Sequence, residues 1–281
     1  MTRVRLAALL ATLACCGCAE SPRSIATAKR LGASDLSTPA EVPAEAAPAR
    51  SEPAAQALVA AMLGAHTKGK PDAVKAFRSF ENVRAGFVLS NTQEPLYQTW
   101  TIRGEWPGRY HVRAELAGLN TVALGWSGDK AWRQLLTPQP GPAFDLDAAE
   151  LTSFKTDVTG EWLLLLFPLL EPDTVVATSP AKAIKDRDCP GVRVWHPALS
   201  EAVLYLDPAT KELAQVTFNG RESMRPVVKE FLVLELKDTA GVRLPSRLAQ
   251  NVSGRQLADW TFTRLEPKTH GATAFDKPVV K

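Results

Sequence analysis

The chain of 281 residues is 45% hydrophobic and 22% charged, with 33 Lys and Arg against 30 Asp and Glu. This composition is typical of a globular protein and excludes fibrous, collagen-like and fully disordered chains. The formal net charge of +3 includes Arg3 and Arg5, which lie in a segment that we expect to be removed, so charge gives no reason to predict nucleic-acid binding. The spacing of the four histidines and four cysteines predicts no metal site, no cofactor and no disulfide framework.

Residues 1–18 are predicted to be an export signal. Arg3 and Arg5 precede an apolar stretch from Leu6 to Ala14, and a cluster of small residues and cysteines follows it. A bilayer-spanning helix needs about 20 apolar residues, so this stretch is too short to be a permanent membrane anchor.

The cysteines after the apolar stretch resemble those of a bacterial lipoprotein signal, in which one cysteine receives a lipid and becomes the new N-terminus. Cys16 has Leu13 three residues before it, whereas Cys18 directly follows the small residue Gly17. We prefer Cys16 as the lipid-anchor residue and keep Cys18 as the second candidate. A plain secretory signal is the alternative interpretation. Neither candidate cysteine is followed by aspartate, the residue that retains enteric lipoproteins in the inner membrane, so the periplasmic face of the outer membrane is the expected location.

Residues 19–53 are rich in alanine and proline and contain no aromatic residue. A segment of this composition cannot form a core, so we expect a disordered tether between the membrane and the folded domain. The folded domain is predicted to cover residues 54–281.

Two short helices are expected at the start of this domain, over residues 54–66 and 71–80, because Gly64 and Gly69 punctuate the gap and Pro71 suits a helix start. The pattern then changes to a period of two. It is clearest from Arg109 to Leu116, where apolar and polar residues alternate. His111 falls on the polar side of this strand, beside Arg109 and Arg113, in a small basic patch that either meets lipid head groups or has no ligand. Further strand-like runs are expected at 87–89, 96–102, 121–126, 131–136, 192–195, 202–206, 213–218, 227–236, 242–248 and 257–265.

These runs predict about ten strands joined by short turns such as Asn219-Gly220, and therefore an antiparallel sheet. Long helices do not separate the runs, which argues against a doubly wound parallel sheet. A sheet of this size is expected to curl, because open sheets of more than about ten strands rarely stay flat.

One helix is expected to interrupt the sheet, over residues 147–167, with acidic residues near its start and Pro168 at its end. Its second half, from Trp162 onward, is apolar on every side, which indicates burial. The fold prediction is therefore α+β: a large antiparallel sheet curled into an incomplete barrel, with helices packed on its concave face.

Sequence motifs for catalysis are not found: G-x-S-x-G, P-loop, G-x-G-x-x-G and H-E-x-x-H are all missing from the printed sequence. Cys189 has no base singled out beside it, and the carboxylate pairs are placed as surface charges would be. We therefore do not predict an enzyme.

Three segments of the sequence resemble the LolA/LolB-like superfamily, in particular the outer membrane lipoprotein-sorting proteins of planctomycete-type bacteria. They are WLLLLFPLL (162–170), AVLYLDPATKEL (202–213) and GVRLPSR (241–247). The resemblance implies an incomplete barrel around helices, with a hydrophobic cavity for acyl chains of lipids or lipoproteins.

The leading hypothesis is a membrane-anchored, monomeric envelope lipoprotein that binds acyl chains, and the alternative is an envelope interaction or sensor protein with a filled core. For the first hypothesis, the side chains expected to contact the ligand are apolar residues of the strands and of the buried helix, which could part to form a cavity. They are Tyr110, Val112, Leu116, Trp162, Leu165, Leu166, Trp260 and Phe262.

Overall fold

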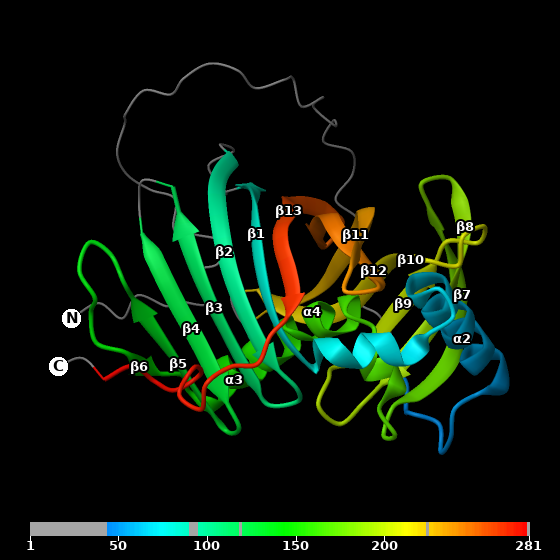
Figure 1. The fold of residues 1–281 in the computed structure, drawn as a ribbon, viewed down its shortest axis with the longest axis horizontal. Helices are drawn as coiled ribbons and strands as arrows, with labels where there is room; N and C mark the ends of the chain where they lie inside the picture. Colours follow the sequence, from blue (N-terminus) through cyan, green and yellow to red (C-terminus); the bar gives the residue numbers. More distant parts are fainter. Residues whose placement is uncertain (1–43, 90–94, 118–119, 223–224, 280–281) are drawn as a thin grey trace.

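Thirteen strands form one antiparallel sheet in a computed structural model that describes residues 44–89, 95–117, 120–222 and 225–279 (Figure 1). The sheet curls but does not close, because its first and last strands, β6 and β7, do not pair with each other. The predicted α+β fold with a curled, incomplete barrel is confirmed. The strands are β1 (Ser79–Leu89), β2 (Pro95–Glu105), β3 (Arg109–Leu116), β4 (Thr121–Ser127), β5 (Lys130–Leu135), β6 (Phe144–Asp145), β7 (Val175–Ile184), β8 (Arg187–Trp195), β9 (Ala202–Leu206), β10 (Leu213–Glu222), β11 (Arg225–Thr239), β12 (Val242–Val252) and β13 (Arg255–Pro267).

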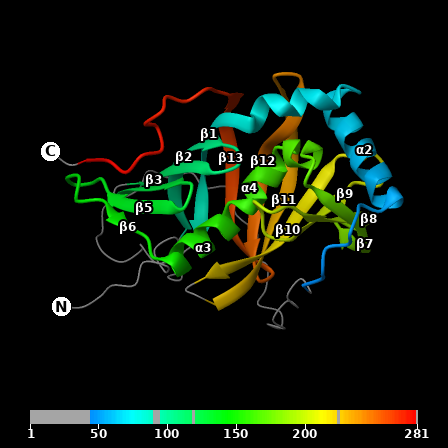
Figure 2. The ribbon, with the colours of Figure 1, turned by 90° about the horizontal axis from the view of Figure 1, so that it is seen from below.

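The sheet consists of two meanders that meet in its middle. The first runs from β1 outward to β6, and the second runs from β7 inward to β13, which pairs with β1. The chain must therefore pass from one edge of the sheet to the other between β6 and β7. It does so through the helical segment, which crosses the concave side of the sheet (Figure 2).

The helices are α2 (Pro53–Thr67), the 3-10 helix η2 (Pro71–Arg78), α3 (Ala148–Asp157), α4 (Thr159–Leu164) and the 3-10 helix η3 (Phe167–Leu170). The prediction of one continuous helix over 147–167 is wrong. Its first part is α3, which starts at a capping box between Asp147 and Glu150, and its second part is the separate helix α4. Leu166 then adopts a positive φ of 63° and ends the helical segment before η3.

All six residues of α4 are buried, as the apolar pattern predicted. Gly160 allows this helix to approach the sheet closely. A Cβ atom at this position would lie 2.4 Å from Cε1 of Phe218 and 2.5 Å from Cε2 of Phe231. α4 is therefore seated on β10 and β11 as part of the core.

The alternation in β3 predicts its orientation correctly, since Tyr110, Val112, Ala114 and Leu116 are all buried. His111 lies on the opposite face, as the alternation predicts, but it is only partly exposed there. Its ring packs at 5.6 Å from that of Trp132, and burial, helped by the nearby charges of Arg103 and Arg113, lowers its pKa to about 4. Neutral at physiological pH, His111 adds no charge to the predicted basic patch.

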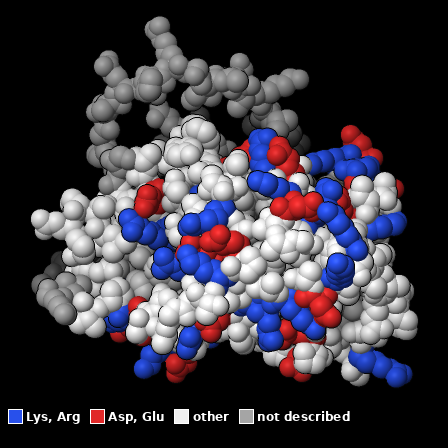
Figure 3. Space-filling view, in the orientation of Figure 1, with Lys and Arg blue, Asp and Glu red and all other residues white. Residues whose placement is uncertain are grey.

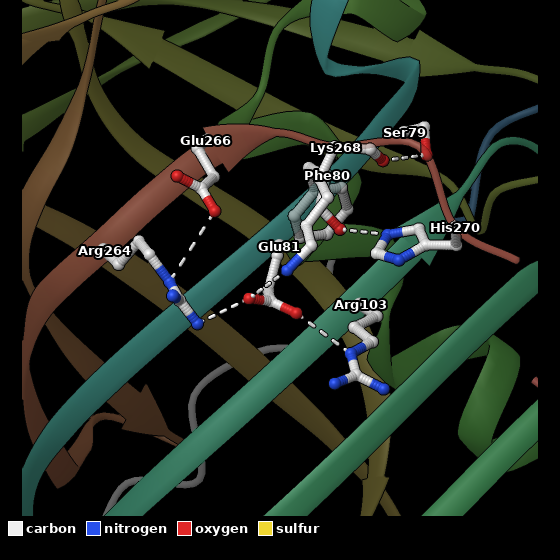
Figure 4. Close-up of polar contacts among 8 residues, drawn as sticks. All are labelled: Ser79, Phe80, Glu81, Arg103, Arg264, Glu266, Lys268 and His270. Atoms are coloured by element: carbon white, nitrogen blue, oxygen red, sulfur yellow. Dashed lines mark hydrogen bonds and ion pairs between the residues drawn. The ribbon is translucent and has the colours of Figure 1, made fainter. Parts of the chain in front are cut away.

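The outer face of the sheet carries acidic and basic side chains beside each other over the middle of the molecule (Figure 3). One cluster of ion pairs is centred on Glu81 of β1, which is only 1% exposed. Its carboxylate accepts hydrogen bonds from Arg103 of β2 and from Arg264 and Lys268 at the end of β13 (Figure 4). Glu81 thus connects the strand pair β1–β13, which joins the two meanders, to β2.

Replacing Glu81 with glutamine is expected to lower the free energy of unfolding at pH 7 by about 1–3 kcal/mol, because charged hydrogen bonds are lost from a buried site. Burial raises the pKa of Glu81, but hydrogen bonds from Lys268 and Arg103 outweigh it, so the net pKa lies below the ordinary value. A lowered pKa stabilises the fold above the unfolded-state pKa, and this stabilisation is lost as the pH falls through the folded-state pKa. Urea unfolding of the wild type and E81Q should therefore show a difference in unfolding free energy that shrinks from pH 7 to pH 3.

The matched control is Glu266→Gln, which removes a half-exposed carboxylate 3.8 Å from Arg264 and should change the unfolding free energy little. A loss of stability in E81Q that is equal at both pH values would contradict the prediction.

The last residues of the predicted tether contact the sheet. Glu45 forms an ion pair with Arg193 of β8 at 3.1 Å, and Glu52 accepts hydrogen bonds from the backbone and side chain of Thr178 of β7. The described chain thus begins its contacts with the domain before α2. Cys16 and Cys18 lie outside the described residues. Within the described segments, the structure contains no helix with the length and apolarity that a membrane crossing requires.

Candidate functional site

A cavity of about 170 Å³ lies between α3 and the concave face of the sheet. Strands from both meanders line it, including β1 to β5 on one side and β10 to β13 on the other. Much of its wall is apolar, with Val88, Val112, Leu124, Phe231 and Leu257 among the lining residues. The cavity therefore has the lining that an acyl chain requires.

The helix α3 forms the roof of this cavity, through Glu150, Ser153, Phe154 and Asp157. Phe154 is the one residue of α3 that is buried, and its ring contacts that of Tyr110 at 6.0 Å. In contrast to α4, all of whose residues are buried, α3 thus has a single buried residue where it lies over the concave side of the sheet (Figure 2).

Three ion pairs connect the helical segment to three strands, and all six side chains line the cavity. Glu150 of α3 pairs with Arg133 of β5 at 3.1 Å, and Asp157 of α3 pairs with Lys229 of β11 at 2.6 Å. Glu161 of α4 pairs with Arg84 of β1 at 2.8 Å. Burial raises the pKa of Asp157, and the charge of Lys229 acts against this shift. The ends of the roof are therefore fixed by electrostatic contacts rather than by a close-packed interface.

Arg84 is the most buried of these charges, at 1% exposure. Its guanidinium packs against the rings of both Trp100 and Trp260, 4.9 Å from each centroid. Glutamine side chains accept the indole N–H of both rings, Gln98 from Trp100 and Gln250 from Trp260. A desolvated cation–π contact contributes about 2 kcal/mol, so this arrangement helps to hold a charge in an apolar cavity.

No family model matches the sequence, and no curated protein matches it. Among solved structures, the chain is similar to the LolA superfamily protein NE2245 from Nitrosomonas europaea, with 13% identity and a TM-score of 0.51 over 79% of this chain and 97% of that one. The chain has a LolA-like fold. Two further structures align with lower scores: a putative outer membrane lipoprotein-sorting protein domain from Vibrio parahaemolyticus (9% identity, TM-score 0.45, 73% of this chain and 95% of that one) and a DUF1329 family protein from Desulfovibrio piger (10%, 0.45, 72% and 93%).

Three of the eight side chains that the sequence predicted as ligand contacts line the cavity of this LolA-like domain: Tyr110, Val112 and Trp260. The structure places the other five elsewhere. Leu116 lies at a second, shallow pocket beside Tyr97 and Thr121. Phe262 lies behind Arg84, 6.0 Å from its guanidinium carbon, and is not part of the lining.

Trp162, Leu165 and Leu166 belong to the solid part of the core and not to the cavity wall. The Trp162 ring makes edge contacts with Phe80, Trp106 and Phe167 at centroid distances of 5.3, 5.4 and 5.8 Å. Space between helix and sheet therefore exists under α3 and not around Trp162, where the sequence placed it.

The charged residues of the cavity were missed by sequence reasoning. A signal for Arg84 was present, because residues 80, 82, 84, 86 and 88 alternate onto the concave face once β1 is taken to start at Ser79. Glu161 was also visible as a carboxylate within an otherwise apolar helical segment. Their pairing was not visible, because the partners are 77 residues apart in the chain.

Proposed function

We propose that this chain is a cell-envelope lipoprotein that binds acyl chains of lipids or lipoproteins in the cavity under α3. The observation that carries the proposal is the cavity itself: a partly apolar space inside a LolA-like sheet, roofed by a helix with a single buried residue. A role in lipoprotein sorting is part of the proposal, and the LolA-like fold is consistent with it. The function is binding and transfer rather than catalysis.

The remaining parts of the proposal concern placement in the cell. Residues 1–18 direct export, Cys16 or Cys18 carries the lipid, and the segment that follows spaces the domain from the periplasmic face of the outer membrane. The contacts of Glu45 and Glu52 with β8 and β7 support a spacer that ends on the domain surface beside those strands. The domain is proposed to act as a monomer, without a metal or cofactor.

Native mass spectrometry of the delipidated full chain, incubated separately with palmitate and with monopalmitoylglycerol, tests this function. We expect at least one acyl probe to bind with one-to-one stoichiometry. Leu124→Trp adds bulk to the cavity wall and should abolish binding, whereas Leu135→Trp, on the exposed surface of β5, should leave binding unchanged. If neither probe binds, the acyl-binding proposal is wrong and the interaction or sensor alternative with a filled core replaces it.

A further inference from the structure

The cavity is lined by more basic than acidic side chains. Four basic side chains line it, Arg84, Arg133, Arg221 and Lys229, against the three carboxylates that pair with Arg84, Arg133 and Lys229. Arg221 of β10 is exposed and takes part in none of the ion pairs found among the described residues, so its charge lies on the solvent side of the cavity lining. An apolar cavity with one basic group in excess favours a ligand that carries negative charge.

Arg84 also has an unused hydrogen-bond donor. Glu161 contacts one terminal nitrogen, Nη1, through both of its oxygens, at 2.8 and 3.0 Å. The Nε–H of Arg84 is buried and has no hydrogen-bond partner among the described residues. A guanidinium binds carboxylate or phosphate best through two parallel N–H donors, and this pairing with Glu161 does not use them. A buried donor without a partner costs free energy, which an entering anion would recover.

On these two observations, and on the acyl-binding function proposed above, we propose that the cavity takes an anionic amphiphile whose carboxylate or phosphate head group contacts Arg84. The hydrocarbon tail lies along Val88, Val112 and Leu257, on the apolar wall of the same cavity. Glu161 occupies the head-group position when the ligand is absent, and the incoming anion competes with it for the guanidinium.

Isothermal titration of the full chain with dodecanoate, dodecyl phosphate, 1-dodecanol and inorganic phosphate tests the head-group preference. We expect both anionic amphiphiles to bind at least about tenfold more tightly than dodecanol, the size of effect that a charge-assisted bidentate contact supplies. Equal binding of dodecanol overturns the anionic head group but leaves acyl binding intact, whereas binding of none of the three amphiphiles overturns the acyl-binding function as well. Inorganic phosphate that binds as tightly as dodecyl phosphate would identify a free-anion site and also overturn the proposal.

Two variants assign the effect to Arg84. Arg84→Met should reduce dodecanoate affinity to that of dodecanol, while the matched control Arg113→Met, which removes a half-exposed arginine from the outer face of β3, should bind like the wild type. Glu161→Gln removes the competing charge and keeps an oxygen acceptor, so it should tighten dodecanoate binding and leave dodecanol binding unchanged. Unchanged dodecanoate affinity in both Arg84→Met and Glu161→Gln would contradict the assignment.

A carboxyl-labelled ligand keeps the proposal testable if Arg84→Met does not fold. The ¹³C carboxyl of [1-¹³C]dodecanoate bound to the ¹⁵N-arginine-labelled wild type should show a dipolar coupling to a guanidinium nitrogen, because the proposed contact places the two groups at hydrogen-bond distance. Bound dodecanoate whose carboxyl carbon couples to no arginine nitrogen would place the head group away from Arg84 and would overturn the proposal.

Discussion

Truncating Glu161 to alanine is expected to lower the free energy of unfolding by about 3–5 kcal/mol, the usual cost of leaving one member of a buried ion pair without its partner. Arg84 is 1% exposed and packs against Trp100 and Trp260, so its charge would be poorly hydrated once the carboxylate is gone. Urea unfolding followed by circular dichroism measures the loss.

The reason for this loss can be separated from a loss of packing. In the double variant Arg84→Met/Glu161→Met, both charges are replaced by flexible apolar side chains, so most of the stability should return. The exposed pair Arg113 and Glu115 provides the comparison, because Glu115→Ala removes a carboxylate that is about half exposed and should cost less than about 1 kcal/mol. A loss for Glu161→Ala as small as that for Glu115→Ala would mean that solvent in the cavity hydrates the charge of Arg84, and would contradict the prediction.

The fold was predictable where local patterns determine it. Strict alternation located β3 at its observed bounds, and acidic residues near Asp147 located the start of α3. The strand β7 was missed because Pro180 interrupts it and the register with β8 shifts between Ser179 and Lys182, which removes the period of two. An edge strand tolerates such features because one of its sides has no partner strand.

The candidate site was less predictable, since it depends on contacts across the whole chain. β1 pairs with β13, and this pairing brings Arg84 beside Trp260 from the other end of the domain. The ion pair between Lys229 and Asp157 joins residues 72 positions apart. Sequence periodicity predicts which face a residue occupies, but not which element lies opposite that face. For this reason the apolar helix around Trp162 was taken for the movable roof, although α3 roofs the cavity.

Replacing Trp162 with alanine is expected to destabilise the domain by about 3–5 kcal/mol, the range typical of deleting a large aromatic side chain from a core. Trp162 is 1% exposed and is surrounded by Phe80, Trp106 and Phe167, while its indole N–H has no hydrogen-bond partner among the described residues. Its contribution is therefore packing, and no hydrogen bond is lost on substitution. Urea unfolding measures the loss.

The variant Trp162→Phe keeps a ring in the cluster and removes the unpaired N–H, so it should cost clearly less than Trp162→Ala, although the smaller ring leaves part of the space unfilled. The same variant tests whether Trp162 contacts a ligand. Because Trp162 lies outside the cavity wall and its ring contacts the wall residue Tyr110 at 5.7 Å, folded Trp162→Phe should bind dodecanoate as the wild type does. If folded Trp162→Phe loses acyl binding, the ligand must reach the aromatic cluster, and the bound state must then open the sheet beyond α3 to the region where the sequence alone placed the site.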